Sequence, residues 1–393
     1  MTDAGDAETT DPGLLTQRRL TLVGTALIVA GLVFAFRSVD VDRVIGEILR
    51  ADPWLLAAAV VVYAASWPLR GRRYGDVLAT TSYPLGTGFL TLTVFLSQTA
   101  NLVVPARGGD AVRAYVLRAR RDVPYPAGFA SLAVERGFDL AAIAVLGAAA
   151  TVWLVAVDAT ALTTVVAGDA YAAVLGAAGV AAATLVAGIL TLGVANVGVS
   201  IGDRLRAAVA GRPRLGRVVA AGLDFAGDIA VVARDPRAIT VVGGGSLLIW
   251  SLDVATAVLV LIALDSGLAV GSLLAVGTLA VSVGNLAKVL PLSQGGVGLY
   301  EAAFTGLVVA LTPLGAGLAL AAAIVDHALK NAVTLVGGGV AVAVFRIRPS
   351  TAAQRGADAD ADLTAMPSSA TDSTAGGAPR TDGSGGGNPG SND

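Results

Sequence analysis

The sequence predicts an all-α polytopic membrane protein, with about eight transmembrane helices and further segments that glycine and proline break. Two observations favour this fold class. Hydrophobic residues make up 55% of the 393-residue chain and charged residues only 14%, against about 25% charged residues in a typical soluble domain. In addition, apolar runs of the length that a spanning helix needs, about 20 residues, recur along the chain.

Eight apolar runs are candidate spans, and the shortest of them ends at Pro313. Because cytoplasmic loops are enriched in Lys and Arg, the arginines that flank the first and last runs predict that both termini lie in the cytoplasm, beneath the cell membrane. The eight runs cover residues 20–36, 53–69, 127–157, 170–197, 238–264, 267–287, 300–313 and 315–345.

The stretch 77–106 has no ionisable Asp, Glu, Lys, Arg or His, and it separates two arginine clusters. Arg70, Arg72 and Arg73 precede it, and five arginines follow within 107–121. If the stretch crossed the membrane once, one of the two clusters would lie outside, against the usual bias of arginine toward the cytoplasm. We therefore expect 77–106 to form a re-entrant hairpin that enters and leaves on the cytoplasmic side.

One membrane domain, 20–346, is predicted between two disordered tails. Residues 1–19 are acidic and continue directly into the first apolar run. Residues 349–393 are rich in Ser, Thr, Gly, Ala and Asp, and such a segment buries too little apolar surface to offset the entropy of ordering. The preference for arginine over lysine is typical of a GC-rich or salt-loving organism, although codon bias alone would produce the same composition.

The composition also excludes several classes of function. The chain has no cysteine, and its one histidine is His327, so thiolate nucleophiles, disulfides and Cys- or His-rich metal sites are ruled out. The net charge of −2 provides no basic field of the kind that nucleic acid requires. No Walker motif is present, so ATP hydrolysis is not expected. We expect neither a metal nor another cofactor.

The first candidate site is the stretch Asn101–Arg113, N-L-V-V-P-A-R-G-G-D-A-V-R, in which a proline and two glycines interrupt the apolar pattern. A helix N-terminus beside two arginines is an arrangement that binds phosphate. An ordinary cytoplasmic loop followed by a capped helix would contain the same residues, and the pattern leaves both interpretations open. The residues of interest are Asn101, Pro105, Arg107, Gly108, Gly109, Asp110 and Arg113.

The second candidate site is A-V-E-R-G-F-D-L, near the start of a long apolar run. Its Glu135 and Asp139 are four residues apart and share a helix face, and Arg136 lies close to that face. Ionisable groups within a transmembrane segment usually contact a partner or a wet cavity. Alternatively, the three residues form an interfacial cluster whose side chains reach the cytoplasmic surface.

The third candidate site is P-L-S-Q-G-G-V-G-L-Y-E, which follows Asn285 and Lys288. Backbone at membrane depth normally forms a complete helix, so this break is expected to be buried in protein or to line a cavity. Both breaks contain Asn-Leu, Pro, Gly-Gly and a carboxylate in the same order, which is typical of the two halves of a transporter site unless it is coincidence. The residues of interest are Pro291, Gly295, Gly296, Gly298 and Glu301.

A polar patch interrupts the last apolar run. Asp326 and Lys330 are four residues apart, the spacing of an ion pair on one helix face, and we expect a structural pair. His327 lies between them. Histidine changes charge near neutral pH, but one histidine does not by itself indicate a proton relay.

Together the three candidate sites, in this order and spacing, resemble the flippase-like transmembrane domain of the lysylphosphatidylglycerol synthases and their stand-alone relatives in bacteria and archaea. The resemblance extends over about residues 20–346. It implies that the protein moves a polar lipid between leaflets, either an anionic or aminoacylated lipid or a polyisoprenyl-phosphate sugar carrier. Membrane lipids are then its ligands, and a lipid synthase or glycosyltransferase is a plausible partner. The resemblance also implies a role for the residues that match its motifs: Asn101, Pro105, Arg107, Gly109, Asp110, Arg113, Glu135, Arg136, Asp139, Pro291, Gly295, Gly296, Gly298 and Glu301.

Three positions depart from the family pattern: Asp110 replaces the usual Glu, Gln294 a common Pro, and His327 a frequent Arg. The aminoacyl-transfer domain of the full-length synthases is absent, so we expect a transporter-like protein and no enzyme activity. Two alternatives stay open, an accessory subunit for a lipid synthase or glycosyltransferase and a membrane enzyme that acts on a lipid headgroup. The acid–base candidates of such an enzyme are Glu135, Asp139 and Glu301.

Overall fold

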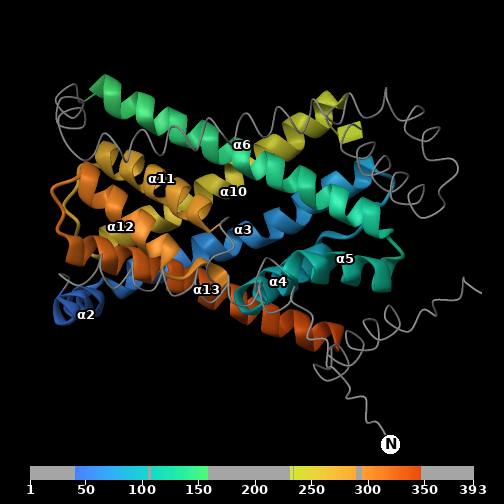
Figure 1. Ribbon diagram of the computed structural model, residues 1–393, viewed down its shortest axis with the longest axis horizontal. Coiled ribbons are helices and arrows are strands. Elements are labelled where there is room, and N and C mark those ends of the chain that lie inside the picture. The colour runs from blue at the N-terminus through green and yellow to red at the C-terminus, as the bar shows by residue number, and fades with distance from the viewer. Residues whose placement is uncertain (1–39, 105–107, 158–230, 233, 289–293, 347–393) are drawn as a thin grey trace, which may run out of the picture. The chain divides into compact units, whose positions relative to one another are not determined.

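The computed structural model describes residues 40–104, 108–157, 231–232, 234–288 and 294–346. Within these residues the regular structure is helical and there is no β-strand (Figure 1), which confirms the predicted all-α class. The helices are α2 (Val41–Arg50), α3 (Pro53–Thr80), α4 (Thr87–Val103), α5 (Gly108–Arg121), α6 (Tyr125–Val157), α10 (Pro236–Ala263), α11 (Val270–Ala287), the short 3-10 helix η2 (Gln294–Gly296), α12 (Leu299–Leu311) and α13 (Ala316–Phe345).

Five of the described helices, α3, α6, α10, α11 and α13, are long and apolar enough to cross a membrane. Each coincides with one of the predicted spans, so the protein is a multi-pass membrane protein. The sixth matching run forms α12, which is only 13 residues long. The predicted spans 20–36 and 170–197, and the two predicted tails, lie outside the described residues. The predicted total of eight spans therefore stays a prediction.

The long helices α3, α6, α10 and α13 connect two ends of the bundle (Figure 1). At one end, which we call the arginine-rich end, Nη2 of Arg120 in the last turn of α5 donates to the carbonyl oxygen of Phe345, at 2.5 Å. At the opposite end, the N–H of Asp52 donates to the carbonyl of Ala263 at 2.9 Å. This bond joins the start of α3 to the end of α10, so these two helices run antiparallel.

The helices α4 and α5 form a hairpin that begins and ends at the arginine-rich end. The ring of Phe89, near the start of α4, lies 5.6 Å from the ring of Phe345. The guanidinium of Arg121, the last residue of α5, lies 4.4 Å from the Phe89 ring centroid. Near the end of α4, Oγ1 of Thr99 donates to the carbonyl of Thr334 at 2.9 Å. Thr334 lies about 16 Å along α13 from the end of that helix. The end of α4 therefore reaches into the bundle, and the hairpin turns there.

The structure has a hairpin beside the predicted one, with other bounds, and its entry from the cytoplasmic side stays a prediction. α3 does not end before Arg70 but continues to Thr80, and the hairpin consists of α4 and α5. The prediction assigned Arg73 to a cytoplasmic loop, whereas this arginine is buried inside α3 and only 2% exposed. An arginine is tolerated there because carboxylates of α6 neutralise its charge, as described below.

The helices α11 and α12 form a second hairpin, which begins and ends at the opposite end of the bundle. α11 begins beside the end of α6, where a Cβ on Gly271 would lie 2.1 Å from the Trp153 ring. α12 ends directly before α13 begins, and the start of α12 packs tightly on α11 through Gly284 and Tyr300. The runs 267–287 and 300–313 were predicted as two separate crossings. In the structure α11 and α12 lie side by side as the two arms of a hairpin (Figure 1), with η2 between them. α11 is long enough for a crossing, and the two crossings stay a prediction.

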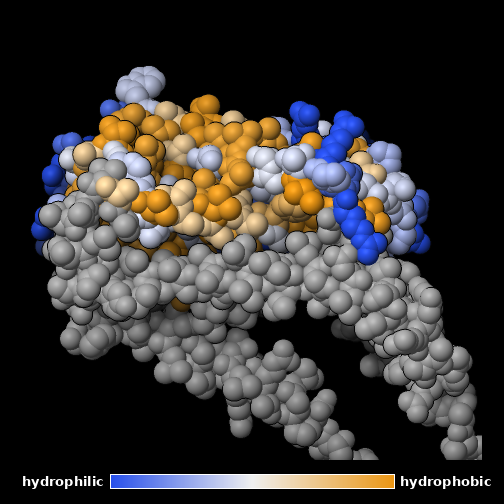
Figure 2. All heavy atoms as spheres, turned by 90° about the horizontal axis from the view of Figure 1, so that it is seen from above, coloured by the Kyte–Doolittle hydropathy of each residue, from blue (hydrophilic) through white to orange (hydrophobic). Residues whose placement is uncertain are grey.

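Small residues bring α4 and α13 into close contact. A Cβ on Gly337 would lie 2.1 Å from the ring of Phe95, which itself stacks on the Trp67 ring at a centroid distance of 3.6 Å. Glycine at such a position lets two transmembrane helices approach closely enough for dispersion contacts, which drive association where both helices are surrounded by apolar material. In Figure 2, apolar side chains cover the middle of the visible face and hydrophilic ones lie toward its two ends.

The glycines of α13 offer a matched test of this packing. A Cβ on Gly338 would lie 1.9 Å from Oγ1 of Thr99, whereas a Cβ on Gly339 would meet nothing within 4 Å. We expect Gly338→Ala to lower the free energy of unfolding by about 1–3 kcal/mol through overpacking. Gly339→Ala should leave it unchanged or raise it by up to about 1 kcal/mol, because alanine favours the helix. Thermal unfolding in detergent measures both, and equal effects would contradict the close α4–α13 contact.

Candidate functional site

The structure brings the first and third candidate sites together, where the tips of the two hairpins meet. A Cβ on Gly295 would lie 2.8 Å from Cδ2 of Leu102. Gly295, Gly296 and Gly298 have φ values of 63°, 76° and 86°, a left-handed conformation that glycine adopts without steric cost. The three glycines thus allow the sharp reversal at η2. Of the other predicted residues in these breaks, Pro105, Arg107 and Pro291 lie outside the described residues.

Asn101 closes the tip of the first hairpin. Its Oδ1 accepts a hydrogen bond from the N–H of Gly109 at 2.9 Å, so the end of α4 is tied to the first turn of α5. A Cβ on Gly109 would lie 1.9 Å from the carbonyl oxygen of Ser97, and a Cβ on Gly108 would lie 2.3 Å from the side chain of Val104. The two glycines are therefore required for the closeness of the two helices.

The second candidate site is the centre of a buried arginine–carboxylate cluster, which we define as Arg73, Arg113, Glu135 and Asp139. Glu135 bridges both arginines: its Oε1 lies 2.6 Å from Nη2 of Arg73, and its Oε2 lies 2.5 Å from Nη1 of Arg113. Nη1 of Arg73 also pairs with Oδ1 of Asp139. The four residues are at most 6% exposed. Two positive and two negative charges balance, as burial of charge requires.

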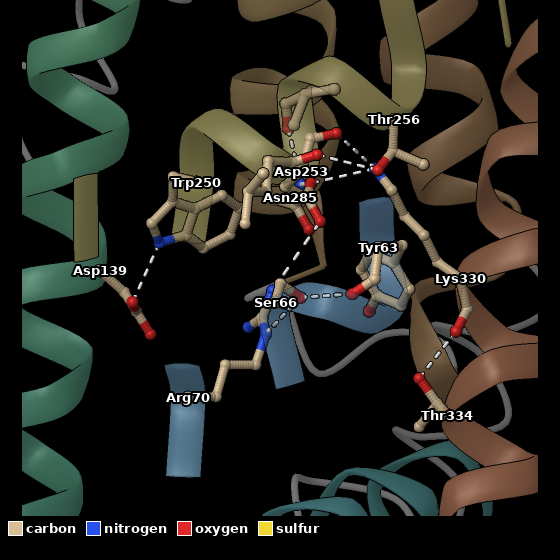
Figure 3. Close-up of polar contacts among 12 residues, drawn as sticks. Tyr63, Ser66, Arg70, Asp139, Trp250, Asp253, Thr256, Asn285, Lys330 and Thr334 are labelled. Atoms are coloured by element: carbon tan, nitrogen blue, oxygen red, sulfur yellow. Dashed lines mark hydrogen bonds and ion pairs between the residues drawn. The ribbon is translucent and has the colours of Figure 1, made fainter. Parts of the chain in front are cut away.

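Neighbouring side chains hold this cluster in place. Nε1 of Trp250 on α10 donates to Oδ1 of Asp139 at 2.9 Å (Figure 3), and Nη1 of Arg73 donates to Oγ of Ser246 at 2.7 Å. The guanidinium of Arg113 lies 4.8 Å from the centroid of the Tyr74 ring, which is cation–π distance. Nη2 of Arg113 is buried and has no hydrogen-bond partner among the described residues.

Two further candidate residues, Asp110 and Arg136, form a bridge from α5 to α6. Nη2 of Arg136 lies 3.1 Å from Oδ1 of Asp110, and both side chains are partly exposed. Arg113 and Glu135 were predicted to contact lipid, and the structure shows them paired with each other. Sequence reasoning missed Arg73, their common partner in α3. The sequence signal that could have found Arg73 is the lack of a turn after it. The residues that follow are compatible with a helix that continues past the arginine.

A second group of charges, the lysine–aspartate cluster, lies between α3, α10 and α13. It consists of Arg70, Asp253, Asp326 and Lys330. Nζ of Lys330 lies 3.0 Å from Oδ2 of Asp253 (Figure 3). It also lies 2.9 Å from Oδ2 of Asp326, which confirms the expected pair on α13. Nη2 of Arg70 is 3.9 Å from Oδ1 of Asp253. Sequence reasoning missed Asp253, although it is the single carboxylate within the long apolar run of α10.

Glu301 connects the second break to α13. Its Oε2 accepts a hydrogen bond from the N–H of Gly298 at 2.6 Å, which caps the start of α12. Its Oε1 lies 2.7 Å from Nδ1 of His327. One turn of α13 is thus bound to α12 by two adjacent contacts, because the hydroxyl of Tyr300 also donates to Oδ2 of Asp326 at 2.5 Å.

Lys288, which is half-buried, differs from the buried cations of the two clusters. Its Nζ lies 4.6 Å from the centroid of the Tyr300 ring, and its stem packs against Gly296, whose Cβ would lie 2.1 Å from Cγ of Lys288. Within the described ranges, no carboxylate forms an ion pair with this ammonium group. In the sequence, Lys288 was noted only as a neighbour of the break. Its lack of an ion pair with a described carboxylate becomes visible only in the folded structure.

The three acid–base candidates lie in different surroundings. Glu135 and Asp139 are buried against arginines, and only Glu301 of the three acid–base candidates lies at a hairpin tip. Within the described ranges, no group of three or more His, Asp or Glu side chains is placed to hold a metal ion.

A family model described as the lysylphosphatidylglycerol synthase TM region matches residues 21–338. The chain belongs to this family. Glycosyltransferase AglD of Haloferax volcanii is 48% identical over 356 residues, which cover 87% of this chain and 57% of the relative. A UPF0104 membrane protein of Methanothermobacter thermautotrophicus is 28% identical over 349 residues, which cover 82% of this chain and 93% of that protein. The chain therefore spans little more than half the length of the first relative.

These similarities confirm the predicted family and its membrane character. They also overturn one expectation. The sequence was taken to indicate a protein without enzyme activity, but the relative that is 48% identical over most of this chain is named as a glycosyltransferase. That name belongs to a longer protein, of which this chain matches 57%. The absence of an aminoacyl-transfer domain therefore does not exclude enzyme activity.

The arginine–carboxylate cluster should dominate the stability of the bundle. Arg73→Gln leaves Asp139 buried with Trp250 as its remaining partner, and breaking a buried ion pair in this way costs about 3–5 kcal/mol. The matched control is Arg118→Gln, which removes an exposed pair with Asp122 worth about 0–1 kcal/mol. Urea or thermal unfolding in detergent compares the two variants, and similar losses would show that the buried cluster does not stabilise the fold.

Proposed function

We propose that this protein moves the polar headgroup of an anionic lipid, or of a lipid-linked sugar intermediate, between the two leaflets of the cell membrane. The observation that carries the proposal is the meeting of two hairpins from opposite ends of the bundle, at Leu102 and Gly295. Broken helices that meet within a membrane domain are the usual location of a transporter's substrate site.

The hairpins lessen the main obstacle to such transport. The free energy of a polar headgroup rises when it enters hydrocarbon without hydrogen-bond partners. The tips of the two hairpins lie inside the bundle, and there the chain offers hydrogen-bond partners to the headgroup. Polar side chains gather around them, with Asn101 on one hairpin and Lys288 and Glu301 on the other. A headgroup that reaches the tips from either leaflet therefore meets groups that replace part of its water.

Lys288 is the group that we assign to the lipid phosphate. The cations of both buried clusters are already paired with carboxylates, whereas Lys288 contacts the Tyr300 ring. A lysine ammonium is a compact charge suited to phosphate. Arg107, which precedes α5, lies outside the described residues and stays a predicted second contact. Asp110 and Arg113 are assigned to holding the hairpin in place, through Arg136 and Glu135.

The distribution of arginine supports a cytoplasmic location for the arginine-rich end. The last turn of α5 contains Arg118, Arg120 and Arg121, and α13 finishes at the same end. Because cytoplasmic segments are enriched in arginine, the α4–α5 hairpin enters from the cytoplasm and the α11–α12 hairpin from outside. This orientation agrees with the expectation that both termini are cytoplasmic.

The similarity to a protein named as a glycosyltransferase favours a sugar-bearing lipid as one substrate. Transfer of a sugar to or from a lipid carrier requires that the carrier headgroup reach the correct leaflet. We propose that the present chain moves the carrier headgroup to that leaflet. Alternatively, it forms the membrane part of a glycosyl-transfer system and recruits a partner enzyme. Co-purification of a stoichiometric glycosyltransferase or lipid synthase would favour the second of these functions.

A lipid-translocation assay tests the proposal. The protein is reconstituted in vesicles that contain a fluorescent anionic phospholipid, and chemical quenching of the outer leaflet reports transbilayer movement. We expect Lys288→Gln to slow movement by about tenfold, equivalent to about 1.4 kcal/mol, because the phosphate loses its cation.

The control for this assay is Arg118→Gln, which removes an exposed charge of the same sign and should leave the rate unchanged. Thermal unfolding of both variants establishes that they are folded. A wild-type rate in Lys288→Gln would exclude Lys288 as the phosphate contact. Absence of movement above that of protein-free vesicles in the unmodified protein would exclude translocation of this lipid.

A further inference from the structure

The short helix α2 has an apolar face that the bundle covers only in part. Its apolar residues recur three and four positions apart, which places them on one arc of the helix. On one side of this arc, Val44 is 5% exposed and belongs to the hydrophobic core. On the other side, Val41, Ile45 and Leu49 are 67%, 49% and 80% exposed. These three side chains form a continuous apolar strip on the surface of α2.

α2 is a separate helix with its own start and end, and it is too short to cross a membrane. At its start, Oδ1 of Asp40 accepts from the N–H groups of Asp42 and Arg43, at 3.0 and 3.3 Å. At its end, Ala51 leaves the helical conformation, with ψ 140°, so the chain turns before α3 begins. Ten residues rise by about 15 Å, half of a hydrocarbon core of about 30 Å. The apolar strip therefore does not belong to a spanning segment.

α2 lies across the end of the bundle that is opposite the arginine-rich end. Figure 1 shows it nearly end-on, whereas the long helices run across the picture. It leads into α3 through Asp52, whose N–H donates to the carbonyl of Ala263 at this end. A Cβ on Gly317, in the first turn of α13, would lie 3.5 Å from Cδ of Arg43. Because α3 and α13 are long enough to cross the membrane, a helix across their starts lies in the plane of the membrane surface.

Trp54, in the first turn of α3, lies at the same level as α2. Its side chain is 82% exposed. Tryptophan is enriched where spanning helices enter the headgroup region, because its ring has an apolar body and a polar N–H. Val270, at the start of α11, is 74% exposed. Exposed apolar side chains on three different helices thus reach this end of the bundle.

The charges of α2 indicate what kind of membrane surface the helix fits. Asp42 and Glu47 are offset by Arg43 and Arg50, so the helix has no excess of positive charge. Helices that bind a membrane through charge have a polar face rich in Lys and Arg, and they depend on anionic lipid. The contact of α2 with a membrane would instead be stabilised by the removal of apolar surface from water.

We propose that α2 is an interfacial helix that inserts Val41, Ile45 and Leu49 into the boundary between the headgroups and the acyl chains. With the arginine-rich end in the cytoplasm, the leaflet that it contacts is the outer one. The occupant of the apolar strip is lipid, whatever the charge of its headgroup. The contact holds the starts of α3 and α13 at a fixed depth in that leaflet.

The absence of cysteine from the chain allows a direct measurement of this depth. Leu49→Cys and Arg50→Cys each introduce one thiol for a nitroxide spin label, and both positions are exposed. Leu49 lies in the apolar strip, whereas Arg50, whose side chain is 73% exposed, lies on the polar face and is the matched control. The proteins are reconstituted in phosphatidylcholine vesicles. Power saturation then gives the collision rates of each label with oxygen, which concentrates in hydrocarbon, and with a water-soluble nickel chelate.

We expect the ratio of oxygen to nickel collisions to be several-fold higher at Leu49 than at Arg50. Ile45→Cys, in the same strip, should give a ratio close to that of Leu49→Cys. Addition of anionic phosphatidylglycerol to the vesicles should leave all three ratios unchanged, because the charges of α2 balance.

Three results would overturn the proposal. Equal ratios at Leu49 and Arg50 would place the apolar strip in water. Low collision rates with both reagents at Leu49 would show that protein covers the strip, either another part of this chain or a second copy. A high ratio that requires anionic lipid would show that charge drives the contact. Because the labels report depth and not lipid movement, each result is independent of the translocation assay.

Discussion

The arrangement of the bundle depends on one buried guanidinium. Arg73 reaches from α3 to two carboxylates of α6 and to Ser246 of α10, so three long helices are fixed at the same level. Glu135 extends this contact to Arg113 of α5. The first hairpin is therefore anchored to the long helices through charges that cannot separate without exposing an unpaired ion to an apolar interior. This anchor also fixes the position of the hairpin's tip, which faces the second hairpin.

Much of this architecture could be predicted from the order of residues, because the signals are local. Apolar runs of sufficient length identify spanning helices, and the two Gly- and Pro-containing breaks indicate where the chain reverses. The pairing of Asp326 with Lys330 follows from a spacing of four residues on one helix. Each of these signals lies within a few turns of one element, and each agrees with the structure.

The central contacts could not be predicted, because they join residues far apart in the chain. Arg73 and Asp139 are 66 positions apart, and Lys330 and Asp253 are 77 apart. The rule that arginines lie in cytoplasmic loops takes no account of carboxylates that neutralise an arginine from another helix. It therefore assigned Arg73 to a loop. Similarly, the 17 residues of α4 are enough for a crossing, and contacts with α13 such as that of Thr99 with Thr334 show how deep the helix reaches.

The two hairpins also determine how the backbone contributes to the field at their tips. Each helix end carries about half an elementary charge, positive at the N-terminus and negative at the C-terminus. α4 and α11 finish at the tips, whereas α5 and α12 begin there. Two positive and two negative helix ends therefore cancel, so the backbone alone has little preference for a ligand of either sign. The choice between anionic, zwitterionic and cationic headgroups then falls to side chains, and exchange of a few residues at the tips would change the lipid without altering the fold.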